Sequence, residues 1–294
     1  MTRGFCTIAT GDYRYSKLAY NLLMSYRRFA GEECHFAVIT DKTNELLENF
    51  DDVIVIKESS ESFVDKLLLF KLCPYDETIF IDADSLAYGD LNKLFFYFRD
   101  ADDISCLGEI LPLNSKNGWF RIEDVEDYKD KIEYTIWLHG GIYFIRKSEN
   151  IYEFFNTCQE IANNYKKYFF RFKYLTEPAD EPIVALAMAI HKYHPIKEQP
   201  EIMAFYRDSQ IKKIDIISGK LAYNVKSGST DKGLLVHWAT ANTRKALYCN
   251  EEKKLEWVIK KGKIKRCIQK VNNIYFKIRY IVLKLRDKLF KEKI

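Results

Sequence analysis

The first 85 residues alternate between short apolar runs and segments whose apolar side chains recur with a helical period. The apolar runs have the length and composition of buried β-strands and lie at residues 5–10, 36–40, 53–56 and 79–81. The segments between them are predicted helices and lie at residues 15–29, 44–49 and 65–72. Strands that alternate with helices are typical of an α/β fold, in which helices cover a mostly parallel sheet.

Beyond residue 85 the pattern is less regular but still predicts defined elements. We expect helices at residues 92–98, 149–170 and 180–193, the last with Pro182 in its first turn, where proline is tolerated. Further strands are predicted at residues 104–107, 141–145 and 234–237, and a hairpin at residues 214–225. Residues 112–134 are polar and mixed, which predicts a loop-rich excursion.

The apolar run of residues 79–81 ends in Asp82-Ala83-Asp84. Asp is disfavoured inside strands, so two of them after an apolar run indicate that the strand has reached the edge of its sheet. In an extended backbone both carboxylates lie on one face, and ligands of parallel sheets bind beyond the carboxyl ends of the strands. Two carboxylates suit Mg²⁺ or Mn²⁺, which in turn bind phosphates. The alternative is a turn with solvated carboxylates.

Composition restricts the class of protein. A chain of 294 residues with 47% hydrophobic residues can bury a substantial core. Its seven cysteines are odd in number, scattered and never in a CxxC pair, which favours reduced thiols in the cytoplasm over a disulfide framework or a zinc site. The first residues enter a strand without a signal-peptide apolar block, and no window of 18 residues is apolar and uncharged, so we expect no membrane-spanning helix.

The charge is distributed unevenly. Residues 253–294 contain 15 Lys or Arg and 3 Asp or Glu, whereas residues 1–252 contain 31 and 39. The basic segment also has one apolar helical stripe, made up of Ile264, Ile268, Val271, Tyr275, Ile278, Val282, Leu285 and Leu289. We predict a catalytic domain at 1–252 and a helical tail at 253–294 that binds an anionic membrane surface or, alternatively, another helix in a homo-oligomer. Nucleic-acid binding is disfavoured because no base-reading module is present.

Several segments, taken in order, resemble the family 8 glycosyltransferases of the GT-A fold, which include glycogenin and bacterial galactosyltransferases of surface-glycan assembly. The resemblance covers residues 4–248. It rests on the segments 4–12, 65–67, 75–77, 79–86, 90–95, 139–142, 179–181 and 236–238. It implies a GT-A fold with a Rossmann-like sheet and a retaining transfer of a hexose from a nucleotide sugar, UDP-linked in our prediction. The acceptor would be a glycan or a lipid-linked molecule at the inner face of a membrane.

The resemblance also implies roles for particular residues. Asp82, Asp84 and His237 would hold Mn²⁺ or Mg²⁺, which stabilises the charge of the departing diphosphate. Catalytic roles would fall to Lys66, Asp180 and Glu181. The nucleotide sugar would be bound by Thr7, Ala9, Thr10, Tyr15, Lys66, Ala83, His139, Gly140, Gly141, Arg244 and Lys245.

The chain departs from the family pattern at several of these positions. Glu181 stands where the family has Gln, and His139 stands where it has Asn, a position that bears on donor specificity. Thr240 and Thr243 replace the late Gly and Lys, so Arg244 or Lys245 would bind the diphosphate, and the choice between these two cations stays open. Tyr13 is an alternative to Tyr15 as the residue that stacks on the base.

Two other functions also fit the motif. A haloacid-dehalogenase-type phosphatase also carries an apolar strand followed by DxD, and Asp82 would then be the nucleophile. Against it, three strand–helix pairs precede the motif here, whereas in that class the motif opens the fold. A non-catalytic membrane-surface binding protein is the second alternative, and the complete set of metal ligands disfavours it.

Overall fold

The computed structural model describes residues 1–57, 59–60, 63–169, 178–197, 199–207, 209–226, 228–261 and 266–291. The chain forms two compact units. The first comprises Met1–Ala19, Glu32–Ala83 and Asn92–Glu198, and the second comprises Tyr20–Gly31, Asp84–Leu91 and Gln199–Ile294. Helix α1 (Tyr13–Phe29) contributes residues to both units.

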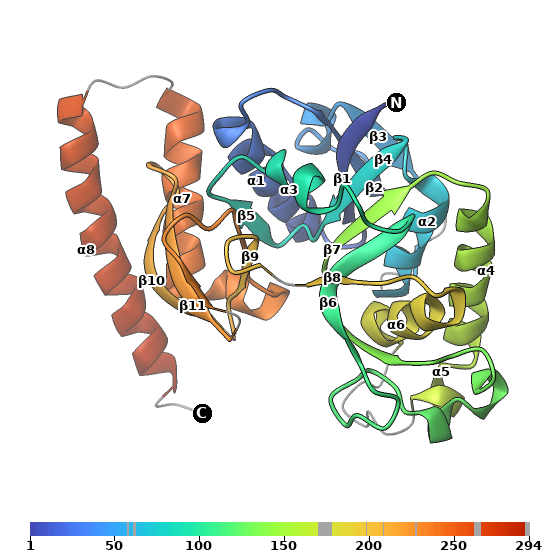
Figure 1. Ribbon diagram of the computed structural model, residues 1–294. Coiled ribbons are helices and arrows are strands. Elements are labelled where there is room, and N and C mark those ends of the chain that lie inside the picture. Colours follow the sequence, from blue (N-terminus) through green and yellow to red (C-terminus); the bar gives the residue numbers. More distant parts are fainter. Residues whose placement is uncertain are drawn as a thin grey trace. The chain divides into compact units, whose positions relative to one another are not determined.

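The first unit is built on a seven-stranded sheet with the order β3-β2-β1-β4-β7-β6-β8 (Figure 1). Its strands are β1 (Arg3–Ala9), β2 (His35–Thr40), β3 (Asp52–Val55), β4 (Glu77–Ile81), β6 (Ile104–Leu111), β7 (Thr135–Arg146) and β8 (Ile196–Lys197). The pairs β1–β2, β2–β3, β1–β4 and β6–β8 are parallel, and β7 runs antiparallel to both β4 and β6. The predicted α/β fold with a mostly parallel sheet is confirmed.

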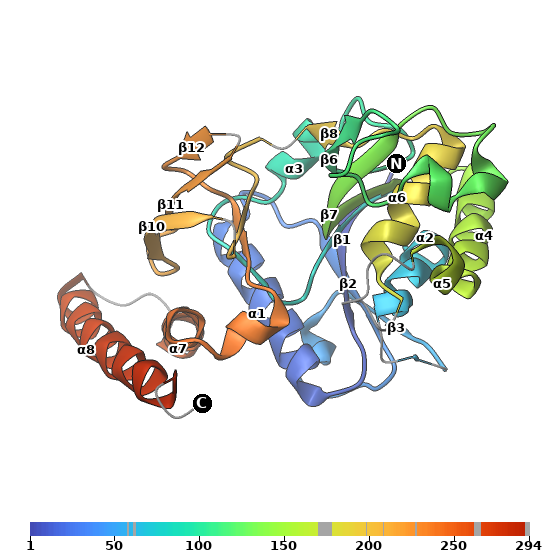
Figure 2. The same ribbon diagram turned by 90° about the horizontal axis from the view of Figure 1, so that it is seen from below.

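Short and long helices cover the sheet of the first unit (Figure 2). They are η1 (Leu47–Asn49), η2 (Phe63–Leu68), α2 (Leu69–Leu72), α3 (Lys93–Tyr97), η3 (Ile122–Asp124), η4 (Glu126–Tyr128), α4 (Asn150–Asn163), α5 (Tyr165–Tyr168) and α6 (Asp180–His191). Helix α6 packs on β7, and α4 packs on α6 and α2, where the rings of Phe70 and Phe154 lie 4.8 Å apart. Elsewhere Phe5 of β1 contacts Phe95 of α3 at 5.3 Å between ring centroids, so buried aromatic rings form much of the core.

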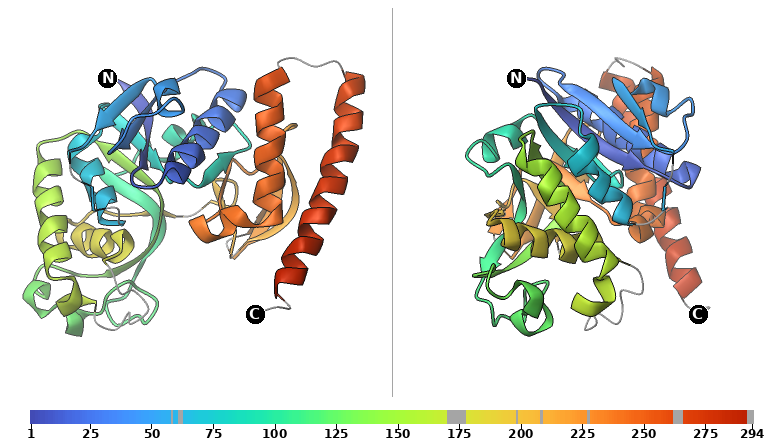
Figure 3. Two further views of the ribbon diagram at one scale, coloured as in Figure 1. Left: turned by 180° about the vertical axis from the view of Figure 1, so that it is seen from behind. Right: turned by 90° about the vertical axis from the view of Figure 1, so that its right-hand side faces the viewer.

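The second unit contains two three-stranded sheets and two long helices (Figure 3). One sheet has the order β5-β13-β9 and the other β10-β11-β12. The elements are β5 (Ser85–Ala87), β9 (Met203–Phe205), β10 (Gln210–Asp215), β11 (Lys220–Val225), β12 (Gly228–Thr230), β13 (Leu235–His237), η5 (Thr240–Arg244), α7 (Ala246–Lys261) and α8 (Arg266–Lys291). Within the described part of the chain, no helix is long and apolar enough to cross a membrane.

Some element boundaries differ from the prediction. Strand β7 begins at Thr135 rather than at residue 141, and the predicted helix 149–170 is divided into α4 and α5, with Phe170 outside the described residues. The predicted hairpin at 214–225 is confirmed by the antiparallel pairing of β10 with β11. The predicted boundary after residue 252 falls inside α7, and the catalytic role of residues 1–252 stays a prediction.

Candidate functional site

Lys66 lies at the centre of a charged cluster in the first unit. It belongs to η2, where its neighbour Leu67 is fully buried and fixes the orientation of the turn. The ammonium nitrogen of Lys66 is 2.9 Å from Oδ1 of Asp82 and 3.4 Å from Oδ2 of Asp180, and it donates a hydrogen bond to the carbonyl oxygen of Gly140 at 3.4 Å. Burial alone would lower the pKa of Lys66, but the charges of Asp180 and Asp82 outweigh burial and raise it. The side chain is therefore charged at neutral pH.

Asp180 and Glu181 open helix α6 and contact the same cluster. The hydroxyl group of Tyr143 donates a hydrogen bond to Oδ2 of Asp180 at 2.8 Å, and the backbone N–H of Gly140 donates one to Oε1 of Glu181 at 2.8 Å. The first turn of a helix favours carboxylates because its N–H groups carry partial positive charge. The predicted catalytic residues Lys66, Asp180 and Glu181 thus lie together in the first unit.

An irregularity of strand β7 brings glycine backbone into this cluster. Cys106 of β6 pairs with Tyr143, but its neighbour Leu107 pairs with His139, so three extra residues of β7 form a bulge. A Cβ atom at Gly140 would lie 2.6 Å from Oδ2 of Asp180. Any other residue at this position would therefore clash with Asp180. The bulge also directs the carbonyl group of Gly141 toward Asp82, whose N–H donates to it at 3.0 Å.

The environment of Glu181 makes the stability of the protein depend on pH. Burial, followed by the charge of Asp180, raises the pKa of Glu181 from 4.5 to about 7. The folded state therefore holds a proton between these values that the unfolded state has lost, and stability falls as the pH rises through this window. A shift of this size corresponds to about 3 kcal/mol.

The substitution Glu181→Gln removes this titration while keeping an oxygen that can accept the N–H of Gly140. We expect the unfolding free energy of the variant, relative to that of the unchanged protein, to rise by about 3 kcal/mol between pH 5 and pH 8. Urea unfolding at both pH values measures this difference. A difference that is the same at pH 5 and pH 8 would refute the raised pKa.

A second polar group lies in the second unit and involves Asp84 and His237. Strand β13 pairs with β5, so His237 lies opposite Ser85, the residue after Asp84. Nε2 of His237 is 3.1 Å from Oδ1 of Asp84, and the hydroxyl group of Thr240 donates a hydrogen bond to Oδ2 of Asp84 at 2.9 Å. Both side chains are nearly buried, with 10% of Asp84 and 12% of His237 exposed. The pairing of a short strand with β13 thus places an imidazole beside the second carboxylate of the motif.

The prediction of an extended backbone through Asp82-Ala83-Asp84 is wrong. Strand β4 ends at Ile81, and Ala83 and Asp84 form a turn that leads into β5. The two carboxylates therefore do not share a strand face. Asp82 contacts Lys66, whereas Asp84 contacts His237. The expectation that Asp82 lies just beyond the carboxyl end of a strand is confirmed, because β4 ends at Ile81. In the sheet β4 lies between β1 and β7.

The residues predicted to bind the base and ribose lie in strand β1 and in the segment that follows it. Thr7 and Ala9 are buried in this strand, and the hydroxyl oxygen of Thr7 has no hydrogen-bond partner among the described residues. Thr10 donates a hydrogen bond to Asp65 at 3.2 Å. Tyr15 lies in the first turns of α1 with 36% of its surface exposed. The alternative residue, Tyr13, donates its hydroxyl hydrogen to Glu45 at 2.7 Å.

The other predicted donor-binding residues occupy both units. Ala83 is nearly buried, and His139 of β7 contacts Trp137 edge-on with 4.5 Å between ring centroids. Arg244 and Lys245 end η5 in the second unit, and both are exposed. The ammonium nitrogen of Lys245 lies 5.4 Å from the centre of the Tyr206 ring, a cation–π contact.

Sequence reasoning missed Tyr143 and the contact of Thr240 with Asp84. In the sequence, Tyr143 is not distinguishable from the apolar strand residues around it. Its hydrogen bond to Asp180 depends on the packing of α6 on β7. In the sequence, Thr240 is distinctive only as a departure from the family pattern. Its position three residues after His237 was the one available signal.

The sequence and the structure were compared with those of known proteins, and only the structure has a match. No protein-family model matches the sequence, and no curated protein sequence matches it either. Among solved structures, the apo structure of the WbbM bifunctional glycosyltransferase is similar, with a TM-score of 0.50 and 14% sequence identity over 84% of this chain. The chain shares its fold with that structure. The chain spans about half of that structure's own chain, 48%. Membership in family 8 stays a prediction.

Proposed function

We propose that the protein is a metal-dependent glycosyltransferase that transfers a hexose from a UDP-linked sugar to a glycan or lipid-linked acceptor. The observation that carries the proposal is the contact of Asp84 with His237, because it adds an imidazole to a DxD motif at the end of a central strand. The glycosyltransferase fold supports the same function. The proposal includes retention of the anomeric configuration, which the resemblance to family 8 implies.

Asp82, Asp84 and His237 would hold one Mn²⁺ or Mg²⁺ ion, each with one ligand atom. Oδ1 of Asp84 and Nε2 of His237 lie 3.1 Å apart, so both atoms could bind the same ion. Only Ala83 separates Asp82 from Asp84, so their Cα atoms cannot lie more than about 7 Å apart. Two carboxylates and one imidazole are a ligand set suited to Mn²⁺. When bound, the ion neutralises the charge of the departing diphosphate.

The residues of the first unit would position the sugar. The ammonium group of Lys66 holds Asp82 and Asp180 in place, and Tyr143 fixes the orientation of Asp180. Carboxylates at Asp180 and Glu181 would hydrogen-bond the hydroxyl groups of the sugar and stabilise positive charge at its anomeric carbon. Residues of β1 and α1 would bind the base and ribose, and Arg244 or Lys245 would bind the diphosphate.

The acceptor and the location are part of the proposal as well. A growing surface glycan at the inner face of a membrane is the acceptor that the resemblance implies. Among the described cysteines, Cys6, Cys73, Cys106, Cys158 and Cys249 are free thiols. Free thiols agree with a cytoplasmic location.

A panel of UDP-sugars tests the proposed function. In the presence of Mn²⁺ the protein should release UDP from one of them, and EDTA should abolish the release because the ion stabilises the leaving group. Phosphate release from a phosphomonoester, with no UDP released from any sugar, would instead support the phosphatase with Asp82 as nucleophile.

A further inference from the structure

Helix α8 has one face that packs on the second unit. Phe276 is 97% buried, and its ring contacts Trp257 of α7 edge-on at 6.2 Å. Further along α8, the guanidinium group of Arg279 donates a hydrogen bond to the carbonyl oxygen of Cys249 at 3.0 Å, and Asp287 accepts the backbone N–H of Ala246 at 2.9 Å. These contacts fix which side of α8 faces α7, and the two helices run side by side in Figures 1 and 3.

The opposite face of α8 is apolar and exposed. Six large apolar side chains have between 57% and 60% of their surface exposed, and they are Ile274, Tyr275, Ile278, Ile281, Val282 and Leu285. Their spacings of three and four residues place them on one stripe of the helix. Four of these residues, Tyr275, Ile278, Val282 and Leu285, belong to the apolar stripe predicted from the sequence. Of its other members, Ile264 lies outside the described residues, as do the side chains of Ile268, Val271 and Leu289. Folded proteins rarely expose a contiguous apolar surface of this kind without a partner.

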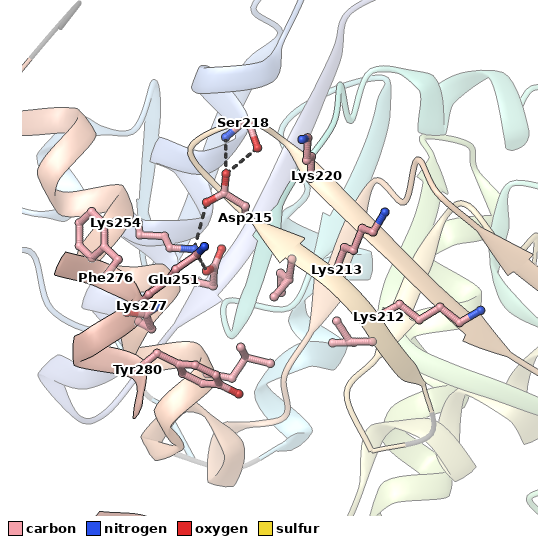
Figure 4. Close-up of a pocket in the computed structure, with 14 residues that line it drawn as sticks. Lys212, Lys213, Asp215, Ser218, Lys220, Glu251, Lys254, Phe276, Lys277 and Tyr280 are labelled. Carbon is pink, nitrogen blue, oxygen red and sulfur yellow. Dashed lines mark hydrogen bonds and ion pairs between the residues drawn. The ribbon is translucent and has the colours of Figure 1, made fainter. Parts of the chain in front are cut away.

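Cations flank the exposed stripe on both sides. At about 100° per residue, Lys277 and Lys284 lie along one edge and Arg279 and Arg286 along the other. Lys277 lines a cavity of about 810 Å³. In this cavity Lys254 is paired with Asp215 and Glu251 (Figure 4). Neither Lys277 nor Lys284 has a carboxylate partner in the described part of the chain, so both remain available to an external anion.

We propose that the exposed face of α8 docks on an anionic lipid bilayer. Its apolar side chains would enter the boundary between headgroups and acyl chains, and Lys277 and Lys284 would contact lipid phosphates. Charge complementarity decides between this occupant and a second copy of the chain. Between Arg266 and Lys291 the helix has eight Lys or Arg and one Asp, so two copies of the face would bring cations together without the opposite charges that a helical pair uses.

Co-sedimentation of the full chain with vesicles tests the proposal. Vesicles of phosphatidylcholine with phosphatidylglycerol should sediment the protein, whereas vesicles of phosphatidylcholine alone should not. Ile278→Glu together with Leu285→Glu should reduce the bound fraction at least tenfold and leave the midpoint of thermal unfolding unchanged, since neither side chain packs on α7. The matched control is Val55→Glu with Tyr152→Glu, which alters two equally exposed apolar side chains outside α8 and should bind as the unchanged protein does.

Three results would overturn the proposal. The first is equal sedimentation with both kinds of vesicle, and the second is equal binding by the α8 variant and the control. The third is a dimer in light scattering that the α8 variant converts to a monomer, with no vesicle binding by either; the face would then be an interface between copies. The test needs no substrate, so its failure leaves the proposed sugar transfer untouched.

Discussion

Replacing Asp84 with Asn is expected to lower the rate of sugar transfer by about three orders of magnitude while leaving the fold intact. A metal ion contributes several kcal/mol to stabilising the leaving diphosphate, and about 4 kcal/mol corresponds to a factor of about a thousand. Asn keeps the shape of Asp84 and can still accept the hydrogen bond from Thr240. The measurement is the rate of UDP release with Mn²⁺ present, together with the midpoint of thermal unfolding.

The control for this prediction is Asp100→Asn. This variant makes the same change in an exposed side chain, 86% accessible, that forms an ion pair with Arg99. This variant should keep full activity. Full activity in Asp84→Asn as well would mean that the second carboxylate of the motif holds no catalytic metal.

Replacing Lys66 with Met should destabilise the protein by about 3 kcal/mol and abolish transfer. The substitution keeps the length of the side chain but removes the charge between Asp82 and Asp180, and a buried charge that loses its partner costs about 3–5 kcal/mol. We place the expected value at the lower end of that range because 15% of Lys66 is exposed. Urea unfolding at pH 7 measures the loss, since the raised pKa keeps Lys66 charged until the pH exceeds its ordinary value.

Two further variants separate charge from packing. Lys71→Met makes the same change at an exposed position of α2 and should alter stability by less than about 0.5 kcal/mol. Asp180→Asn in the Lys66→Met background should recover part of the lost stability, because it removes one of the carboxylates left without a cation. A double variant less stable than Lys66→Met alone would contradict the electrostatic explanation.

Local sequence patterns were sufficient to predict most strands and helices of the first unit, but not β8, η3 or η4. The apolar runs of β1, β2 and β4 are fully buried over most of their length, so each carries a strong signal. Strands β5 and β9 have three residues each, too few for a pattern to show. The bulge in β7 was not predictable either, because it depends on how β6 and β4 pair with opposite edges of that strand.

The candidate site was predicted in its residues but not in its geometry. The order of Lys66, Asp82 and Asp180 along the chain gave no indication that one ammonium group contacts both carboxylates, since the crossovers between strands bring them together. The turn at Ala83 and Asp84 could not be predicted from the sequence, because a single small residue between two Asp is compatible with a strand as well as with a turn. The apolar stripe of α8 was visible, whereas the face that packs on α7 was not, because Phe276 gives a weak signal beside so many apolar neighbours.

The central claim is that Asp82, Asp84 and His237 hold one divalent cation. Its most direct test is a titration of the full chain with Mn²⁺, in which electron paramagnetic resonance measures the free ion. We expect one bound Mn²⁺ per chain and clearly weaker binding in Asp84→Asn and in His237→Ala. Absence of binding, or the same affinity in the unchanged protein and both variants, would contradict it.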